Sequence, residues 1–515
     1  MATHTKLPVQ RIALWAALLF SSVPNVWAAP PVALTITNFS RSNGTSVISW
    51  AAETNAFNNV LFTVQRATAP NSNFTNLANV SENVPLVYTD SGSSNPAAFY
   101  RIVESNAYTS LFQSGAFTAY NAANTSGLDT TGYGGAIFDG RYIYFVPARN
   151  DLQSKGIVLR FDTTGDFNTA GSWAAYDASI TSGLSTKGYL GGVFDGRYVY
   201  FAPNQNVPGY HGNVLRLDTT GNFNTAGSWS AYDASTTSGL DTRGFLGGVF
   251  DGRYVYFVPS YNGTNYHGRV LRFDTTTNFT SAGSWSAYDA GITSGLTTKG
   301  FIGGVFDGRY IYFVPDYNGS DYSGTVLRFD TTGNFSTAGS WSAYDASITS
   351  GLTTKGFAGG VFDGRYVYFV PDKYFGAFHG NVLRFDTTGN FSNAGSWSAY
   401  NAGNTSGLTT KGYASGVFDG RYIHFIPDYN GTAYHGTVLR LDTTGDFNTA
   451  GSWSAYDAGV TSGLNTKGYF GGVSDGRYIY FSPFYYGTAY HGVVLRFDAK
   501  LPRAIPATVR GGSNL

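Results

Sequence analysis

The chain has 515 residues, of which 42% are hydrophobic and 12% are charged, and its 32 basic side chains balance 32 acidic ones. This balance argues against a nucleic-acid-binding protein, which needs a basic patch, and the 17% aromatic content argues against a disordered chain. Cysteine is absent, which excludes disulfide bonds, thiolate metal ligands and a cysteine nucleophile.

Residues 1–28 have the pattern of a secretory signal peptide. Lys6 and Arg11 precede the short apolar run 12–20, and small residues stand before a cleavage point after Ala28. No later segment reaches the roughly 20 apolar residues that a membrane-spanning helix needs. We therefore expect a secreted protein, extracellular, periplasmic or on the cell surface, without a membrane span after cleavage. An uncleaved N-terminal anchor is the alternative.

Residues 31–110 contain short alternating segments divided by Asn, Ser, Gly and Pro, a pattern that predicts a β-sandwich. Trp50 lies in the second segment, the third contains 64–66, and the region ends with 88–90 and 99–102. In these features it resembles a fibronectin type III module. The resemblance implies a spacer or an adhesion module, and rarely a catalyst.

Residues 114–500 contain one unit of 56 residues seven times. Each unit contains the string Asp-Gly-Arg-Tyr, which marks a hairpin turn. It starts at Asp139, Asp195, Asp251, Asp307, Asp363, Asp419 and Asp475. Four short alternating segments per unit are separated by an Asp-Gly turn, a proline stop and polar loops, so the unit predicts four strands. Seven such units predict an all-β fold with a seven-bladed β-propeller.

The two ends of the repeat region indicate ring closure. The last unit stops after its third strand at 494–498, and the missing fourth strand is present at the front, at 116–120. Phe117 lies 56 residues before Trp173 and so occupies the tryptophan position. We expect this N-terminal strand to complete the last blade, because an open array would expose unpaired edges. Residues 501–515 are expected to form a flexible tail.

The unit also resembles the kelch-type propeller repeat, in its Asp-Gly-Arg-Tyr-Val-Tyr-Phe, Val-Leu-Arg-Phe-Asp and Ser-Trp strings. The resemblance implies binding of a protein or a ligand more often than catalysis.

Side chains that recur in almost every unit are first interpreted as structural. The arginine and aspartate of the third strand, Arg272 and Asp274 for example, share one strand face and are interpreted as hydrogen-bonding links between blades. Six tryptophans of the fourth strands are expected to pack between blades: Trp173, Trp229, Trp285, Trp341, Trp397 and Trp453.

Two loops of each unit are expected on one face of the propeller. The loop before the first strand carries a cation, which either lies at the mouth of the central channel or points outward into solvent. These cations are Lys187, Arg243, Lys299, Lys355, Lys411 and Lys467.

The loop between the second and third strands combines Tyr, Asn and His, residues that suit sugar recognition by stacking and by hydrogen bonds, and that equally suit a well-satisfied loop. The candidates are His211, Tyr261, Asn262, His267, His379, Tyr429, Asn430, His435 and His491.

Catalytic signatures are weak. The 114–500 region contains no glutamate, whereas a glycosidase needs two carboxylates at one place, and no nucleophile elbow or phosphate-binding loop is present. The histidines belong to different blades, which argues against a zinc site. We therefore predict no catalytic residue, no metal and no cofactor.

The sequence thus favours an exported, monomeric, non-catalytic binding protein whose partner is a glycan bound through repeated loops. A cell-surface adhesion or protein-interaction scaffold is the first alternative. A propeller hydrolase or lyase is the second, and its site would lie in the irregular segments 149–155 and 372–375.

Overall fold

The computed structural model describes residues 34–42, 45–52, 61–67, 75–81, 87–90, 99–105, 112–151 and 153–499. The expected signal peptide (1–28) and tail (501–515) lie outside the described residues. Within these described ranges, no helix is long and apolar enough to cross a membrane.

Six strands precede the repeats and form two three-stranded antiparallel sheets, in the orders β1-β2-β5 and β4-β3-β6. Two such sheets are the arrangement that the sandwich prediction requires. Membership of the fibronectin type III family stays a prediction. The strands are β1 (Leu34–Ser42), β2 (Thr45–Ala52), β3 (Leu61–Ala67), β4 (Thr75–Ser81), β5 (Val87–Asp90) and β6 (Phe99–Ser105).

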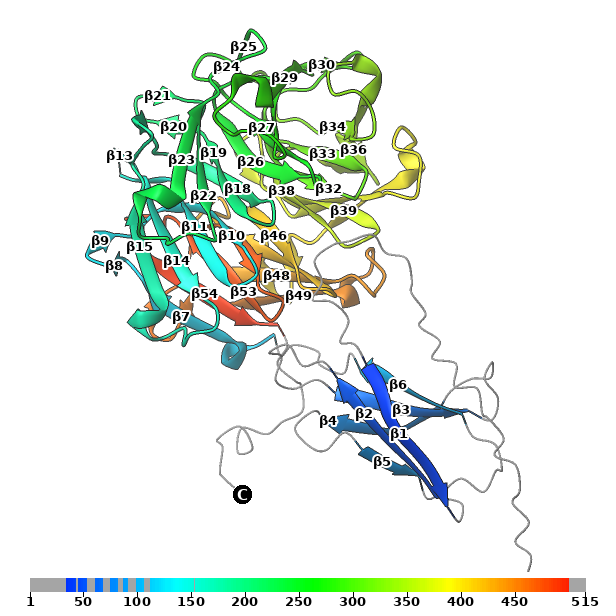
Figure 1. The fold of residues 1–515 in the computed structure, drawn as a ribbon. Coiled ribbons are helices and arrows are strands. Elements are labelled where there is room, and N and C mark those ends of the chain that lie inside the picture. The colour runs from blue at the N-terminus through cyan, green and yellow to red at the C-terminus, as the bar shows by residue number, and fades with distance from the viewer. Residues whose placement is uncertain are drawn as a thin grey trace, which may run out of the picture.

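The repeats form a seven-bladed β-propeller, as predicted, and each blade is a four-stranded antiparallel sheet (Figure 1). Blade 1 contains β10 (Tyr133–Phe138), β11 (Tyr142–Pro147), β14 (Ile157–Asp162) and β15 (Trp173–Asp177); blade 2 contains β18 (Tyr189–Phe194), β19 (Tyr198–Pro203), β22 (Asn213–Asp218) and β23 (Trp229–Asp233). Blade 3 contains β26 (Phe245–Phe250), β27 (Tyr254–Pro259), β28 (Arg269–Asp274) and β29 (Trp285–Asp289); blade 4 contains β32 (Phe301–Phe306), β33 (Tyr310–Pro315), β34 (Thr325–Asp330) and β35 (Trp341–Asp345).

The remaining blades follow the same pattern. Blade 5 contains β38 (Phe357–Phe362), β39 (Tyr366–Pro371), β42 (Asn381–Asp386) and β43 (Trp397–Asn401); blade 6 contains β46 (Tyr413–Phe418), β47 (Tyr422–Pro427), β48 (Thr437–Asp442) and β49 (Trp453–Asp457). Blade 7 contains β52 (Tyr469–Ser474), β53 (Tyr478–Pro483), β54 (Val493–Asp498) and β7 (Phe117–Asn121).

The predicted closure of the ring is confirmed. Strand β7 pairs antiparallel with β54, in a register that places Asn121 opposite Val493 and Phe117 opposite Phe497. The first strands of neighbouring blades contact one another around the whole ring, including β10 of blade 1 with β52 of blade 7. The two ends of the repeat region are therefore held in one blade (Figure 1).

The di-glycine of the first strand is explained by the packing of these innermost strands. Gly191 has a φ of +72°, and a Cβ atom there would lie 2.8 Å from the Cα of Gly247 in the next blade. That distance is too short for two carbon atoms, so a side chain at Gly191 would push two blades apart.

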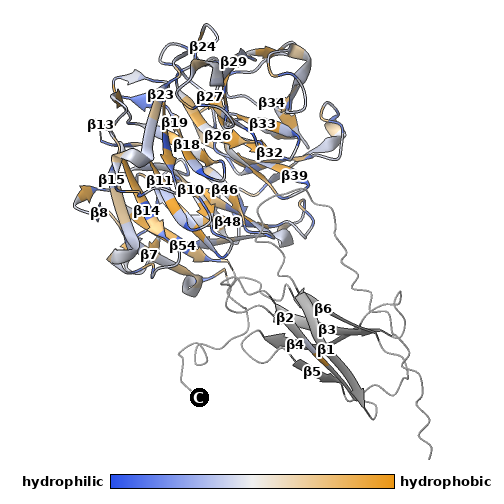
Figure 2. Ribbon diagram, viewed as in Figure 1, coloured by the Kyte–Doolittle hydropathy of each residue, from blue (hydrophilic) through white to orange (hydrophobic). Residues whose placement is uncertain are grey.

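The tryptophans pack between blades, as predicted. Trp229 of blade 2 is 6% exposed, and its ring stacks on Tyr176 of blade 1 with centroids 5.1 Å apart, while its indole N–H donates to the carbonyl of Phe223. Phe117 makes the equivalent stack on Tyr456, so the closing strand also supplies the aromatic side chain of its blade. Apolar residues accordingly concentrate in the blade strands, for example in β33 and β34 (Figure 2).

The third-strand arginine links blades by ring contacts, and the prediction that Arg272 and Asp274 link blades by hydrogen bonds was wrong, because the hydrogen bonds of both stay within their own blade. The guanidinium of Arg272 lies 4.2 Å from the ring centroid of Tyr254 in its own blade and 4.2 Å from that of Phe335 in the next. Asp274 instead pairs with Arg253 inside the same blade, at 2.7 Å. The Nε of Arg272 also donates to the hydroxyl of Ser286 in the same blade, at 3.1 Å, and its flat, weakly hydrated guanidinium suits the place between two rings.

Small hairpins between the blades protect the outer edge strands, and strand patterning did not reveal them because each strand has only two residues. The hydroxyl of Ser182, in the hairpin after blade 1, accepts the N–H of Ala231 in the outer strand of blade 2, at 3.1 Å. These hairpins are β8 (Asn124–Thr125) with β9 (Leu128–Asp129), β16 (Ile180–Thr181) with β17 (Leu184–Ser185), β24 (Thr236–Thr237) with β25 (Leu240–Asp241), β30 (Ile292–Thr293) with β31 (Leu296–Thr297), β36 (Ile348–Thr349) with β37 (Leu352–Thr353), β44 (Asn404–Thr405) with β45 (Leu408–Thr409), and β50 (Val460–Thr461) with β51 (Leu464–Asn465).

Two further kinds of short element complete the blades. Three of the loops between second and third strands contain a hairpin, namely β12 (Arg149–Asn150) with β13 (Gln153–Ser154), β20 (Gln205–Asn206) with β21 (Gly209–Tyr210), and β40 (Lys373–Tyr374) with β41 (Ala377–Phe378). A single 3₁₀ turn precedes each fourth strand: η1 (Ser114–Ala116), η2 (Ala170–Ser172), η3 (Ala226–Ser228), η4 (Ala282–Ser284), η5 (Ala338–Ser340), η6 (Ala394–Ser396) and η7 (Ala450–Ser452).

Replacing Trp341 by alanine is expected to lower the free energy of unfolding by about 3–5 kcal/mol, because the cavity opens between two blades. The measurement is the urea midpoint of the full chain. Ile348→Ala is the matched control, since Ile348 is 69% exposed on the outer hairpin and its loss should change stability by less than about 0.5 kcal/mol. Equal shifts for the two variants would contradict the packing role of the tryptophan.

Candidate ligand-binding face

The two predicted loops of each blade lie together and connect neighbouring blades. In blade 2, the backbone N–H of Asn204 donates to the carbonyl of Gly188, and Gly188 donates to the carbonyl of Lys155 in blade 1. One loop therefore joins the first strand of its own blade to the preceding blade. Because the contact recurs around the ring, these loops form one continuous layer, which is the candidate ligand-binding face.

Four of the five predicted histidines are buried within this layer and His379 is half-buried, and in each of the five both ring nitrogens are bonded to the backbone. In blade 3, Nδ1 of His267 accepts the N–H of Arg269 at 3.2 Å, so the neutral ring carries its proton on Nε2, which donates to the carbonyl of Arg243 at 2.9 Å. The same pair of bonds is made by His211, His379, His435 and His491. The imidazoles therefore connect the two loops.

Burial lowers the pKa of every one of these five histidines, because the charged ring would lose its hydration. The pKa is about 4 for His211, His267 and His491, against an ordinary value of 6.5. For His379 and His435 the pKa is lowered for the same cause. The rings therefore remain neutral over the range in which an exposed histidine titrates.

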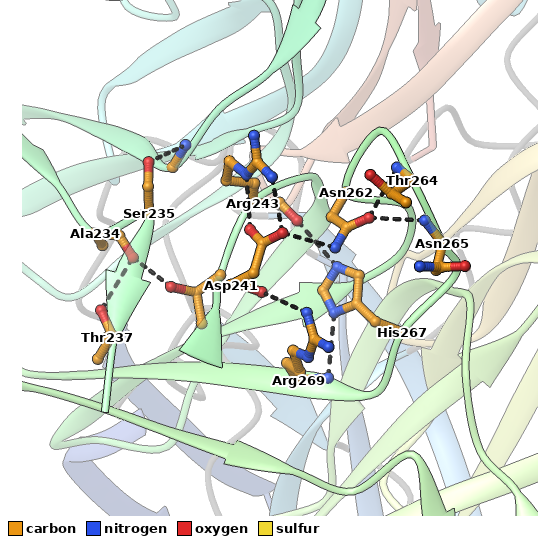
Figure 3. A network of polar contacts seen from close by, with 12 residues as sticks. Ala234, Ser235, Thr237, Asp241, Arg243, Asn262, Thr264, Asn265, His267 and Arg269 are labelled. Atoms are coloured by element: carbon orange, nitrogen blue, oxygen red, sulfur yellow. Dashed lines mark hydrogen bonds and ion pairs between the residues drawn. The ribbon is translucent and has the colours of Figure 1, made fainter. Parts of the chain in front are cut away.

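A polar network around Asp241 shows how the remaining predicted residues are held (Figure 3). Both carboxylate oxygens of Asp241 accept from Arg243, at 2.7 and 2.8 Å, and one of them also accepts the side-chain amide of Asn262 at 2.9 Å. The amide oxygen of Asn262 accepts the backbone N–H groups of Thr264 and Asn265, so the asparagine shapes its own loop. Asn430 accepts the two equivalent N–H groups in blade 6.

The six predicted cations are half-buried and lie against these loops. Arg243 pairs with Asp241, and Lys355 pairs with Asp321 at 2.9 Å. The stems of Lys299, Lys411 and Lys467 lie beside three glycines that stand two residues beyond the outer strands, namely Gly291, Gly403 and Gly459. Among the described residues no contact supports a cation ring at the channel mouth, and that role stays a prediction.

A chain of aromatic side chains runs over the face, and the sequence reading identified only part of it. In blade 3, Tyr261 contacts Tyr266 at 4.9 Å between centroids, Tyr261 also contacts Tyr210 of blade 2 at 5.2 Å, and Tyr266 contacts Tyr317 of blade 4 at 5.1 Å. We call the whole set the aromatic crown: Tyr210, Tyr261, Tyr266, Tyr317, Tyr322, Phe378, Tyr429, Tyr434, Tyr485 and Tyr490.

The crown extends over blades 2 to 7 and is interrupted by two cationic side chains. The ammonium of Lys373 lies 6.0 Å from the ring centroid of Tyr322, and the guanidinium of Arg149 lies 5.9 Å from that of Tyr490. All ten rings are half-buried, so each keeps part of its surface in solvent. The hydroxyls of Tyr261, Tyr266 and Tyr317 donate to none of the residues that the structure describes. Open ring surface and free hydroxyls are what a ligand with both apolar and hydroxyl faces requires.

Of the ten crown rings, only Tyr261 and Tyr429 were predicted from the sequence, although a signal for others is visible there. Four of the missed rings directly precede the loop histidine, in a Tyr-His-Gly string that recurs with the repeat: Tyr210, Tyr266, Tyr434 and Tyr490. The histidine was chosen as the candidate because its ring can donate, accept and titrate, whereas the neighbouring half-buried tyrosine is the residue with open ring surface.

A comparison with models of known protein families found no match, and a search of curated protein sequences also found none. Among the described residues, no three His, Asp or Glu side chains lie close enough to hold a metal ion. The fold defines the class, a seven-bladed β-propeller, and the candidate site is defined by its side chains alone.

Replacing His267 by serine is expected to lower stability near neutral pH by about 1–3 kcal/mol, because the carbonyl of Arg243 loses its donor. Serine is tolerated at this position, since Ser323 stands there in blade 4 and its hydroxyl accepts the N–H of Thr325. The measurement is the difference in urea midpoint between the wild type and the variant as a function of pH.

The stability advantage of the wild type should narrow as the pH falls from 6.5 to 4. Below 6.5 the unfolded chain binds a proton on His267 that the folded ring, with a pKa of about 4, does not bind, so protonation favours unfolding by roughly 3 kcal/mol. Because other titrating groups contribute equally to the stability of the two proteins, their effects cancel in the difference. These groups include the aspartates with a raised pKa, whose protonation favours the folded state. A difference independent of pH would contradict the neutral, doubly bonded ring.

Proposed function

We propose that this protein is an exported, non-catalytic carbohydrate-binding protein and that the aromatic crown is its binding surface. The single observation that carries the proposal is the chain of ten half-buried rings on one face of the propeller, among which the hydroxyls of Tyr261, Tyr266 and Tyr317 are free of partners within the described residues. A β-propeller of this kind fits a binding or scaffold role, and the kelch resemblance of the unit adds to that expectation.

Carbohydrate fits the crown better than a purely apolar or purely charged ligand. Sugar rings present C–H faces that pack on aromatic rings, and hydroxyls that bond to groups such as the phenol of Tyr266 or Tyr317. Similar loops in neighbouring blades would contact successive units of a chain, so weak single contacts add up to useful affinity. The β-sandwich would act as a spacer, and the signal peptide would direct export of a monomer.

The double variant Tyr261→Gln, Tyr266→Ser is expected to bind its glycan about tenfold more weakly than the wild type, because two stacking surfaces are lost at one site. Both substitutions copy residues that the fold already accepts at these positions, Gln205 in blade 2 and Ser154 in blade 1. A glycan array identifies the ligand, and calorimetric titration of that ligand gives the change in Kd.

The matched control is Ile292→Thr, which copies Thr236 and changes a 76% exposed side chain on the outer hairpin. The control should bind as the wild type does. If the double variant also binds normally, the crown is not the binding surface. A blank array together with capture of a surface protein would replace the carbohydrate proposal by the protein-scaffold alternative.

A further inference from the structure

Three consecutive blades carry an aspartate at a position where the other four blades carry uncharged residues. Asp316, Asp372 and Asp428 directly follow the proline that ends β33, β39 and β47. We call them the acidic arc. The equivalent residues elsewhere are Ala148, Asn204, Ser260 and Phe484, so the arc breaks the symmetry of the ring.

The arc lies beside the innermost strands and next to the crown. In blade 2 the amide of Asn204 reaches the next blade and donates to the carbonyl of Phe245, the first residue of β26, at 3.0 Å. The charge of Asp316 acts on the phenol of Tyr266, and the charge of Asp428 acts on the phenol of Tyr434. The carboxylates and the crown hydroxyls therefore share one region of the face.

The fold leaves two of these three carboxylates partly unsatisfied. One oxygen of Asp316 and one of Asp428 are buried without a hydrogen-bond partner, because an ionised carboxylate cannot donate as Asn204 does. Burial raises the pKa of Asp316 to about 6 and that of Asp428 to about 7. Burial also raises the pKa of Asp372, with a further contribution from the charges of Asp316 and Asp428. A buried carboxylate oxygen without a partner destabilises a fold, so its presence in Asp316 and again in Asp428 indicates a use other than stability.

The protein's own ammonium group shows what chemistry the arc accepts. The charge of Lys373 acts on all three carboxylates, and its ammonium lies near the ring of Tyr322. One ammonium among three carboxylates leaves the arc with excess negative charge. The neighbouring Lys355 is already paired with Asp321. Carboxylates beside aromatic faces are the combination that binds an organic ammonium ion.

We propose that the acidic arc selects glycans that carry a protonated amino group, which binds among Asp316, Asp372 and Asp428 while the sugar rings pack on the crown. This inference rests on the proposed carbohydrate-binding function and names its ligand class. The arc lies in blades 4 to 6, so the amino sugar binds on one side of the face only.

The test compares a glucosamine oligosaccharide with its fully N-acetylated counterpart of the same length, by calorimetric titration of the full chain at neutral pH, because the carboxylates of the arc take up protons at acidic pH. The two ligands differ in the charge of the amino groups. The wild type should bind the amino form about tenfold more tightly, as expected for a desolvated charge contact.

The variant Asp372→Asn, which copies Asn204, should remove this preference and at the same time raise the urea midpoint, because a buried charge is replaced by an amide that can donate. Asp345→Asn is the matched control: it copies Asn401, removes the same charge from the end of β35, and should leave the preference unchanged.

Each outcome bears on the inference. A lost preference with a raised midpoint supports the arc as the recognition site. An unchanged preference in Asp372→Asn gives the aspartate a structural role only and overturns the inference. Equal binding of both oligosaccharides by the wild type also overturns it, while the crown variant still tests the proposed function. Binding of neither oligosaccharide, together with a blank glycan array, overturns the proposed function itself and the inference with it.

Discussion

Each blade leaves an aromatic face that only the next blade can cover. The third-strand arginine makes this contact seven times, placed between a tyrosine of its own blade and a phenylalanine of the next. At the junction of blades 6 and 7 the phenylalanine is Phe112, from the segment before the closing strand, and it lies 4.3 Å from the guanidinium of Arg440. The N-terminal segment therefore supplies the fourth strand of blade 7 and also the ring that covers blade 6.

The candidate site depends on the same closure. Contacts within the aromatic crown alternate between rings of one blade and rings of neighbouring blades, so the crown exists only where the blades are held side by side. The buried histidines fix the loops that carry the rings, and they do so in the neutral form. Rigid loops reduce the entropy lost on binding, which is why a surface of weak contacts can still bind usefully.

The fold was predictable from the sequence, and the site was predictable only in part. A perfect period of 56 residues defines blades, strand order and closure, because each depends on local pattern and spacing. The edge-to-face contact of Tyr210 with Tyr261 joins residues 51 positions apart in different blades, and no local sequence pattern predicts such a contact. The histidines suggested ligand chemistry by residue type, but their surroundings, which only the fold supplies, use both nitrogens.

The acidic arc illustrates the same limit. The Val-Pro-Asp and Ile-Pro-Asp strings of three units are visible in the sequence, yet an aspartate after a proline normally indicates a solvated turn. The packing of the blades, which the sequence does not show, is what buries carboxylate oxygens of the arc and places the arc beside Lys373 and the crown.

The most direct test of the account is hydroxyl-radical footprinting of the full chain with and without its glycan ligand. The account predicts protection of crown tyrosines such as Tyr261 and Tyr266. Tyr254, which lies half-buried at the opposite end of β27, should react equally in both samples. Protection of Tyr254 with an unchanged crown would contradict the assignment of the binding face.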